Sequence, residues 1–429
     1  MHSFHYLNGS LHVEDVPLAT IAENYGSPTF VYSAATLRER FQSLTSALSG
    51  LDHEVAFAVK ANSNVAVLSH LKSLGASFDI VSAGELYRVL QAGGDASKCT
   101  FAGVGKTREE ITYALEAGIH AFNVESEAEL NFINKVAGEM SSIAPISIRV
   151  NPNVDAKTHK YISTGKSENK FGIDFEVITE VFERASKLPN IQLKGLQMHI
   201  GSQLTSVQPF HDAVTKVAPL AAQLKENYGI DFFSIGGGIG IVYENALASG
   251  QSDWWDQQNP KTKPLTAEEY ASILVPLLKD LGLKILLEPG RYIAGNAGVL
   301  LTRCLYEKKG SAKTFKIIDA GMNDLIRPAL YEGYHEIVPI IQKENQASLK
   351  MDVVGPVCET GDFFCQDREL PDFAEDEIIA VMSAGAYGAV MGSSYNTRPL
   401  PTEILVDGTE VKEVRRRQTF ADLLAQENY

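Results

Sequence analysis

The chain has 429 residues, of which 45% are hydrophobic and 21% are charged, so it is long enough for a large domain plus a smaller one. Its formal net charge of −15 at pH 7 argues against nucleic acid or an anionic membrane as the main partner. The 4 cysteines have no CxxC spacing, the 10 histidines have no metal-ligand spacing, and no segment has the length and apolarity of a membrane span. We therefore expect a cytoplasmic protein without a metal site.

The N-terminal segment, residues 1–28, alternates weakly between apolar and polar residues and contains the turn signal Asn8-Gly9. It predicts a short β arm that leads into a helix around residues 37–48. Apolar, strand-like runs then follow at 54–60, 78–83, 99–104, 121–125, 145–151, 194–200, 231–236 and 284–288. Segments with helical periodicity separate them, for example 65–74, 83–91, 127–136 and 207–228.

Strands that alternate with helices in this way, over about 260 residues, predict a (β/α)8 TIM-like barrel at residues 29–290. An open, doubly wound sheet is the structural alternative, but no Gly-x-Gly-x-x-Gly motif follows the first strand. Between Tyr243 and Leu265 a polar stretch carries Trp254-Trp255, and we expect a surface loop at one end of the barrel.

After Gly290 the pattern changes to short strand-like runs separated by turn residues. These runs are 298–306, 314–319, 337–342, 349–354, 377–382 and 403–406. They predict a C-terminal antiparallel β domain, residues 291–429, which the N-terminal arm 1–28 joins. A helix over 420–426 could close the chain.

Lys60 comes at the end of the apolar run 55–59. A buried ammonium is costly unless it is paired or chemically used. For a single lysine, a strand end with its amine in solvent is the more common situation. The alternative is a desolvated amine that forms a Schiff base with a carbonyl compound.

Other polar groups also come at the ends of predicted strands, where a barrel collects its chemistry. They are Asp79, Arg149, Asn151, His199, Gly236-Gly237-Gly238 and Glu288. Consecutive glycines most often make a tight turn, but they can also present backbone N–H groups to a phosphate, with Ser202 adding a hydroxyl. His199 is either a core histidine or a flat ring that stacks on an aromatic cofactor.

Glu288 follows the buried run 285–287 and needs a cationic partner. That partner could be Arg291, three residues later in Glu288-Pro289-Gly290-Arg291. It could also be the protonated pyridine nitrogen of a cofactor, which would indicate a function. An amine, a phosphate cradle, a stacking ring and a carboxylate together predict a pocket for pyridoxal 5'-phosphate (PLP).

Long motifs extend this pattern over nearly the whole chain. They are Phe57–Asn62, Phe78–Glu85, Tyr161–Gly165 with Asn169–Gly172, His199–Gln203, Gly236–Gly240, Glu288–Arg291, Arg327–Tyr331, Gly355–Glu359 and Gly385–Gly388. With them the chain resembles the fold-type III PLP-dependent decarboxylases, and within that family the members that convert meso-2,6-diaminopimelate to L-lysine and CO2. The resemblance implies a barrel with a C-terminal β domain and a homodimer with shared active sites.

The resemblance also implies a role for each matching residue. Lys60 corresponds to the Schiff-base lysine, His199 to the ring that stacks on PLP, and Glu288 to the partner of the pyridine nitrogen. Asp79, Ser202, Gly236, Gly237, Gly238, Gly290, Arg291 and Tyr387 correspond to cofactor contacts. Arg291, Arg327, Tyr331, Glu359 and Tyr387 correspond to substrate contacts. Cys358, from the other subunit, corresponds to the donor that reprotonates the α-carbon, and Glu359 to the residue that binds the distal ammonium.

Arginine's planar fork suits bidentate capture of a carboxylate, so arginines near the far end of the substrate favour a molecule with an acid there. Decarboxylases acting on ornithine, arginine or a carboxylated polyamine are the nearest alternatives, and a catalytically dead regulator with this fold is a second. The barrel of alanine racemase is shared, but its tyrosine base motif has no counterpart here. Thr360 and Val242 depart from the serine and proline common in the family, and neither has a core role.

Overall fold

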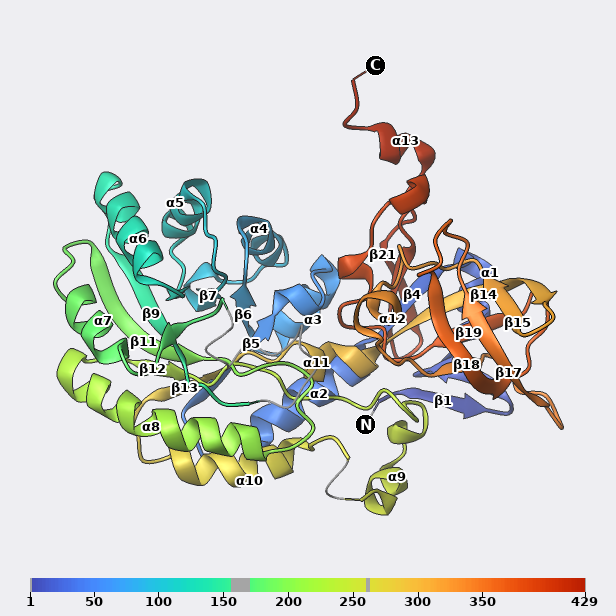
Figure 1. Ribbon diagram of the computed structural model, residues 1–429, viewed down its shortest axis with the longest axis horizontal. Helices are drawn as coiled ribbons and strands as arrows, with labels where there is room; N and C mark the ends of the chain where they lie inside the picture. Colours follow the sequence, from blue (N-terminus) through green and yellow to red (C-terminus); the bar gives the residue numbers. More distant parts are fainter. Residues whose placement is uncertain (1, 156–169, 260–262, 429) are drawn as a thin grey trace. The chain divides into compact units, whose positions relative to one another are not determined.

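The computed structural model describes residues 2–155, 170–259 and 263–428. The chain folds into two compact units (Figure 1). The barrel unit comprises residues 40–241 and 260–292, and the β unit comprises residues 1–39, 242–259 and 293–429.

The barrel unit contains a closed parallel sheet in the order β9-β11-β12-β13-β5-β6-β7-β8, which pairing of β8 with β9 closes. Its strands are β5 His53–Ala58, β6 Ser77–Ile80, β7 Cys99–Phe101, β8 Ala121–Val124, β9 Ala144–Asn151, β11 Ile191–Met198, β12 Phe232–Ser234 and β13 Lys284–Leu287, and β10 Ile173–Asp174 adds to β9. Each of the eight predicted barrel strands is present, so the predicted barrel is confirmed.

Helices follow the strands and lie outside them (Figure 1). They are α3 Val65–Ser73, α4 Ala83–Gln91, α5 Arg108–Ala117, α6 Glu127–Glu139, α7 Ile178–Ala185, α8 Gln208–Tyr228 and α10 Ala267–Leu278, with the short 3-10 turns η1 Val59–Ala61 and η2 Ala96–Lys98. Local sequence fixes several of their starts. Thr107 and Glu110 form a capping box at α5, and Thr266 and Glu269 form another at α10.

The β unit has a nine-stranded sheet whose main path runs β18-β17-β15-β14-β4-β20-β21, with β19 pairing both β14 and β16. Its strands are β4 Thr29–Ser33, β14 Gly298–Lys309, β15 Thr314–Ile318, β16 Ile337–Pro339, β17 Ser348–Val354, β18 Phe363–Pro371, β19 Ile378–Val381, β20 Thr402–Asp407 and β21 Glu410–Arg415. The sheet is mostly antiparallel as predicted, but β15 pairs with β17, and β20 with β4, in parallel.

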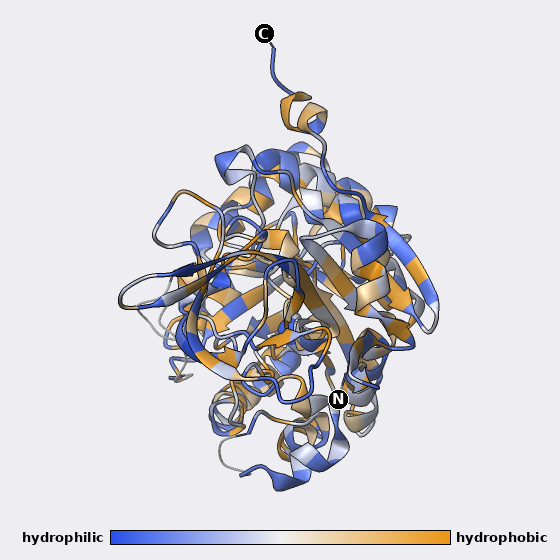
Figure 2. Ribbon diagram, turned by 90° about the vertical axis from the view of Figure 1, so that its right-hand side faces the viewer, coloured by the Kyte–Doolittle hydropathy of each residue, from blue (hydrophilic) through white to orange (hydrophobic). Residues whose placement is uncertain are grey.

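The N-terminal arm forms a separate antiparallel sheet of β1 Phe4–Leu7, β2 Ser10–Val13 and β3 Val16–Pro17, followed by α1 Leu18–Tyr25. It joins the β unit as predicted, because Leu11 N–H donates to the Ile340 carbonyl at 2.7 Å and Phe4, Leu11 and Val13 pack into the same core as Val299 and Ile404. In Figure 2 the short helix α13 (Phe420–Leu424) near the C-terminus is largely hydrophobic in colour, whereas the last residues after it are hydrophilic.

Two segments predicted to lie within residues 29–290 group with the β unit. β4 does so because it pairs with β14 and β20. Residues 242–259 do so because Leu247 N–H donates to Glu336 at 2.7 Å and His2 Nε2 bonds to the Ala246 carbonyl at 2.7 Å.

The stretch with Trp254-Trp255 is not simply a surface loop. It contains η3 Ala248–Gly250 and the short helix α9 Ser252–Gln257, and the Trp255 indole donates to the Ser249 carbonyl at 2.9 Å. None of the α9 residues is buried, so no periodic apolar face could reveal this helix in the sequence. The remaining elements are α2 Ala34–Ala47, α11 Arg291–Ala294, η4 Gly295–Ala297, α12 Arg327–Tyr331, η5 Ala389–Met391, η6 Tyr395–Thr397 and α13 Phe420–Leu424.

Candidate active site

Lys60 lies in the 3-10 turn η1, directly after β5, the first barrel strand along the chain. Its Nζ is 3.7 Å from Oδ2 of Asp79 on the neighbouring strand β6. The Lys60 side chain is 41% exposed and that of Asp79 is 1% exposed. The amine is therefore neither isolated in solvent nor fully desolvated: it is an accessible amine paired with a buried acid.

Asp79 is an unusual carboxyl group. Burial, and next the negative charge of Glu288, raise its pKa well above the ordinary value, against the lowering effect of Lys60. Among the described residues, neither of its oxygens has a hydrogen-bond partner. A buried polar atom without a partner needs an explanation, such as a bound water, a bound group or a part in a reaction.

Glu288 follows β13 and is held by side chains from other barrel strands. Ser234 Oγ donates to Oε1 at 2.7 Å, and Gln197 Nε2 donates to Oε2 at 2.9 Å. Asn123 Nδ2 lies 3.5 Å from Oε1, and Asn123 in turn accepts a hydrogen bond from Ser147. Glu288 is 7% exposed, so these donors fix the direction of a nearly buried carboxylate.

The residues that hold Glu288 were not predicted from the sequence, although the sequence contains an indication of them. Ser234, Gln197, Asn123 and Ser147 are polar yet buried, and they interrupt otherwise apolar strands. Inward-pointing polar residues in a barrel strand need partners, which is the signal that could have identified them.

His199 lies just beyond β11, and the Gly237 N–H donates to its Nδ1 at 3.2 Å. Burial, followed by the positive charges of Arg149 and Lys60, lowers the pKa of His199 well below its ordinary value. With Nδ1 accepting, the neutral ring carries its hydrogen on Nε2.

Gly236, Gly237 and Gly238 let three strand-end loops approach closely. Gly236 and Gly238 have φ of +72° and +105°, and a Cβ on Gly237 would lie 2.1 Å from the Glu288 carbonyl oxygen. Any side chain here would push apart the segments that carry His199 and Glu288. Close packing alone accounts for these glycines, and a role in binding phosphate stays a prediction.

Arg291 and Ser202 also meet in the barrel unit, because Arg291 Nη2 donates to Ser202 Oγ at 3.1 Å. Gly290, just before Arg291, packs closely, since a Cβ there would lie 2.8 Å from that of Ala61. Arg149 has a different partner: its Nη1 lies 2.9 and 3.1 Å from the two oxygens of buried Glu125.

The other predicted site residues belong to the β unit. Arg327 and Tyr331 lie on α12, and Arg327 is 6% exposed. Cys358 and Glu359 are exposed in the turn between β17 and β18. Tyr387 has φ of +56°, a strained conformation for an aromatic residue and one that clusters at functional sites.

Part of one motif lies outside the described residues, namely Tyr161–Gly165 and Asn169. Its end is described: the Phe171 ring lies 4.9 Å from the Arg149 guanidinium carbon, and Gly172 N–H donates to Glu125 at 3.0 Å.

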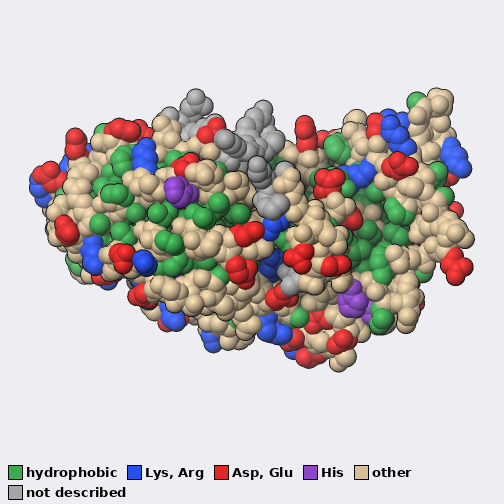
Figure 3. Space-filling view, turned by 90° about the horizontal axis from the view of Figure 1, so that it is seen from below, with side chains coloured by type: hydrophobic (Ala, Val, Ile, Leu, Met, Phe, Trp, Pro, Cys, Tyr) green, Lys and Arg blue, Asp and Glu red, His purple; other side chains and the backbone are tan. Residues whose placement is uncertain are grey.

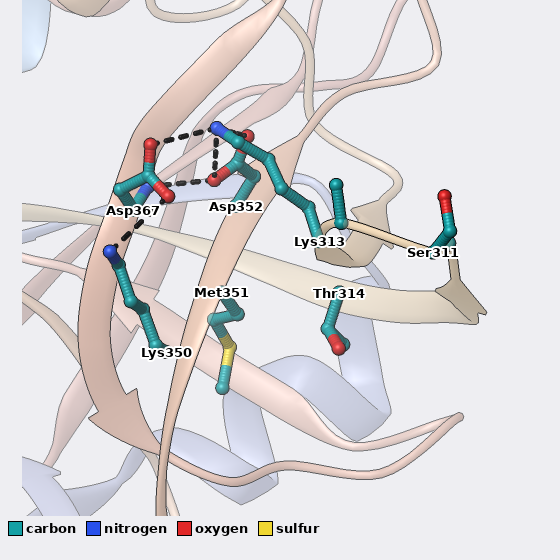
Figure 4. Close-up of a pocket in the computed structure, with 9 residues that line it drawn as sticks. Ser311, Lys313, Thr314, Lys350, Met351, Asp352 and Asp367 are labelled. Carbon is teal, nitrogen blue, oxygen red and sulfur yellow. Dashed lines mark hydrogen bonds and ion pairs between the residues drawn. The ribbon is translucent and has the colours of Figure 1, made fainter.

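An open pocket of about 290 Å³ in the β unit is a different feature (Figure 4). Its charged groups neutralise one another, since Lys313 Nζ lies 3.0 Å from Asp352 and 2.8 Å from Asp367. None of the predicted site residues lines it.

Comparison with known proteins gives full-length matches. The family "Pyridoxal-dependent decarboxylase, pyridoxal binding domain" matches residues 34–295. The diaminopimelate decarboxylase of Haemophilus influenzae is 49% identical over 430 residues, which is 100% of both chains. This chain belongs to the diaminopimelate decarboxylase family.

Solved structures agree with this assignment. The diaminopimelate decarboxylase of M. jannaschii in co-complex with L-lysine has a TM-score of 0.90 at 34% identity, over 100% of this chain and 98% of that chain. The Helicobacter pylori diaminopimelate decarboxylase complexed with L-lysine has a TM-score of 0.88 at 39% identity, over 96% of this chain and 99% of that chain. The predicted family, barrel fold and PLP cofactor are thus confirmed.

The residues of this diaminopimelate decarboxylase family member suit PLP. An accessible amine, a held carboxylate and a neutral imidazole follow the barrel strands β5, β13 and β11, respectively. Buried oxygens of Asp79 and Gln197 have no hydrogen-bond partner among the described residues. These are groups that a polar ring cofactor can satisfy.

None of the described helices is long and apolar enough to cross a membrane. On the face in Figure 3 acidic side chains prevail over basic ones, in keeping with the formal net charge of −15.

Proposed function

We propose that this chain decarboxylates meso-2,6-diaminopimelate to L-lysine and CO2 with PLP, the final step of lysine biosynthesis. The observation that carries the proposal is the group formed by Lys60, Asp79, His199 and Glu288 at the barrel strand ends, in a chain 49% identical over its full length to a diaminopimelate decarboxylase.

In the barrel unit, Lys60 would hold the cofactor through its side-chain amine, which is accessible beside Asp79. When bound, PLP supplies an electron-poor ring that accepts the electron pair left behind by departing CO2. Glu288, held by Ser234 and Gln197, would be the partner of the ring nitrogen and would hold its proton. His199, as a neutral imidazole, would be the stacking partner of the ring.

Gly236, Gly237, Gly238 and Ser202 would hold the phosphate of the cofactor, and Tyr387, Gly290 and Asp79 would be its further contacts. The bond between Arg291 and Ser202 ties a substrate-binding arginine to this phosphate site.

In the β unit, Arg327 and Tyr331 hold the carboxylate at the far end of the substrate. Glu359 binds the ammonium beside that carboxylate. The Cys358 thiol gives its proton to the carbon that has lost CO2, and the resulting thiolate regains a proton from solvent.

We further propose a homodimer in which Cys358 and Glu359 serve the partner's site. Their exposure supports this role, because exposed polar residues can serve a second subunit. Four free thiols support a reducing cytoplasm as the place of action.

Purified protein supplied with PLP and meso-2,6-diaminopimelate tests the proposal, with L-lysine and CO2 as the measured products. Turnover of diaminopimelate but not of ornithine, arginine or a carboxylated polyamine is the expected result. Bound PLP without turnover of any of these amino acids would instead favour a catalytically dead regulator.

A further inference from the structure

The Arg327 side chain is held by a neighbour to which no role has been given. Arg327 Nη1 lies 2.7 Å from Nε2 of His335, eight positions along the chain. His335 is 0% exposed and Arg327 is 6% exposed, so this hydrogen bond lies inside the β unit.

The chemistry of the two side chains determines the tautomer of His335. A guanidinium can only donate, so Nε2 of His335 accepts. Nδ1 then carries the hydrogen and donates it to the Met382 carbonyl, 2.8 Å away. His335 therefore links the Arg327 guanidinium to the backbone just beyond strand β19, and it does so as a neutral imidazole.

Tyr243 completes the support of Arg327. The Arg327 guanidinium carbon lies 4.5 Å from the centre of the Tyr243 ring, and the same ring meets His335 edge to face at 5.3 Å and 80°. One face of the guanidinium is thus covered by Tyr243, while one of its edges is bonded to His335. Helix α12 has only five residues, too few to orient a long side chain by itself.

We propose that His335 is a positioning residue that orients Arg327 and thereby sets the preference for a substrate with a carboxylate at its far end. The proposal rests on the proposed function of Arg327. A guanidinium fixed on one edge and one face keeps its other donors in a defined plane, which is what bidentate capture of a carboxylate requires. Substrates without that carboxylate gain nothing from the arrangement.

Two small ligands separate this role from a general structural one. L-Lysine, the product, retains the carboxylate at the far end, whereas 1,5-diaminopentane has the same carbon chain and amines without it. Their inhibition constants against meso-2,6-diaminopimelate therefore report carboxylate binding in the folded holoenzyme.

Two variants of His335 carry the same amide group on side chains of different length, so that only the longer one can contact Arg327. His335→Gln can place its amide oxygen near the position of Nε2 and accept from Arg327. His335→Asn stays near the Met382 carbonyl but is too short to reach Arg327. For His335→Asn we expect the KM for diaminopimelate and the inhibition constant of L-lysine to rise roughly 10- to 100-fold, the loss expected for a hydrogen bond to a charged group.

The other measurements should move little. In His335→Asn, PLP absorbance, kcat and the inhibition constant of 1,5-diaminopentane should stay within about threefold of wild type, while His335→Gln should restore most of the L-lysine affinity. His211→Leu, which removes a partly exposed histidine of α8, is the control and should leave all constants unchanged.

Equal weakening of L-lysine and 1,5-diaminopentane, or unchanged L-lysine affinity in His335→Asn, would overturn the positioning role. If neither variant folds, His335→Leu or His335→Phe replaces them. A variant that still binds L-lysine more tightly than 1,5-diaminopentane overturns the positioning role, and a variant that has lost this preference supports the role. A wild-type protein that does not turn over diaminopimelate refutes the proposed function itself, which is a separate and earlier result.

Discussion

The Gly237 N–H donates to Nδ1 of His199 at 3.2 Å, and a ring nitrogen that accepts this bond cannot also carry a proton. The bond therefore works in the same direction as burial and the nearby Arg149 and Lys60 charges, which hold the pKa of His199 below its ordinary value of 6.5. The folded protein keeps a neutral imidazole where the unfolded chain takes up a proton.

This difference predicts how stability depends on pH. Below pH 6.5 the unfolded chain binds a proton at His199 that the folded chain refuses, so wild-type stability falls as pH falls from 6.5 towards the lowered pKa. His199→Phe removes the titration. The stability of wild type relative to His199→Phe should decrease between pH 7.5 and pH 5 in thermal melts, and parallel curves would contradict the assignment.

Lys60→Ala should abolish covalent attachment of PLP. In wild type, reduction with borohydride should fix the cofactor mass on the peptide that contains Lys60, because the Lys60 amine is the accessible one beside Asp79. The variant should show no fixed cofactor and no turnover. Lys72→Ala, which removes an exposed lysine of α3, is the control. Cofactor fixed to another lysine in the variant would rule out Lys60.

Glu288→Gln should lower kcat by roughly 100-fold or more, the scale of losing one preorganised charge in a buried site. The amide fills the same space, but its NH2 would face the donor of Gln197 or of Ser234, and it cannot hold a proton on the ring nitrogen. Steady-state kinetics with PLP content measured in parallel is the test. Glu226→Gln on α8 is the exposed control, and wild-type kcat in Glu288→Gln would show that this carboxylate is not needed.

The barrel could be predicted because each of its strands is a short apolar run followed by a helix. The strands β18 and β21 could not. β18 contains Gln366, Asp367, Arg368 and Glu369 in succession, and β21 is an edge strand with four charged residues in six. Their stability comes from pairing with β17 and β20, respectively. The periodicity of apolar residues within a strand does not show such a pairing.

The candidate site also contains residues that could be predicted from the sequence and residues that could not. Lys60, Asp79, His199 and Glu288 stand out because a charged or titratable residue at the end of an apolar strand is unusual. Gln197 and Ser234 are marked only as polar residues within apolar strands, and the sequence does not show that Glu288 is their partner. His335 carries no such mark, since its importance comes from a hydrogen bond to Arg327 around a turn. Such pairs are determined by tertiary structure.

Cys358→Ala should lower decarboxylation by orders of magnitude while PLP stays bound, because the thiol is the proposed proton donor to the product carbon. Cofactor absorbance and kcat, measured on the same preparation, test this. Cys304→Ala is a poor control because Cys304 is buried, so Thr360→Ala, in the same exposed turn, is preferable. Wild-type turnover in Cys358→Ala would refute the role.

Asp362 holds the turn that presents Cys358 and Glu359. It is 3% exposed, its Oδ1 accepts from Met322 N–H and its Oδ2 accepts from Val357 N–H, both at 2.6 Å. Asp362→Ala leaves both N–H groups without this partner, which should cost about 2–3 kcal/mol of unfolding free energy and lower kcat while PLP remains bound. Chemical unfolding and steady-state kinetics measure the two effects.

The double variant decides whether Asp362 acts through the turn. If Asp362 only positions the Cys358 thiol, removing it after Cys358 is already gone should cost nothing further in kcat, so Asp362→Ala/Cys358→Ala should match Cys358→Ala. The losses in stability should still appear, because the two N–H groups lack their acceptor whether or not the thiol is present. Multiplying kcat losses would mean instead that Asp362 affects the reaction by a route independent of Cys358.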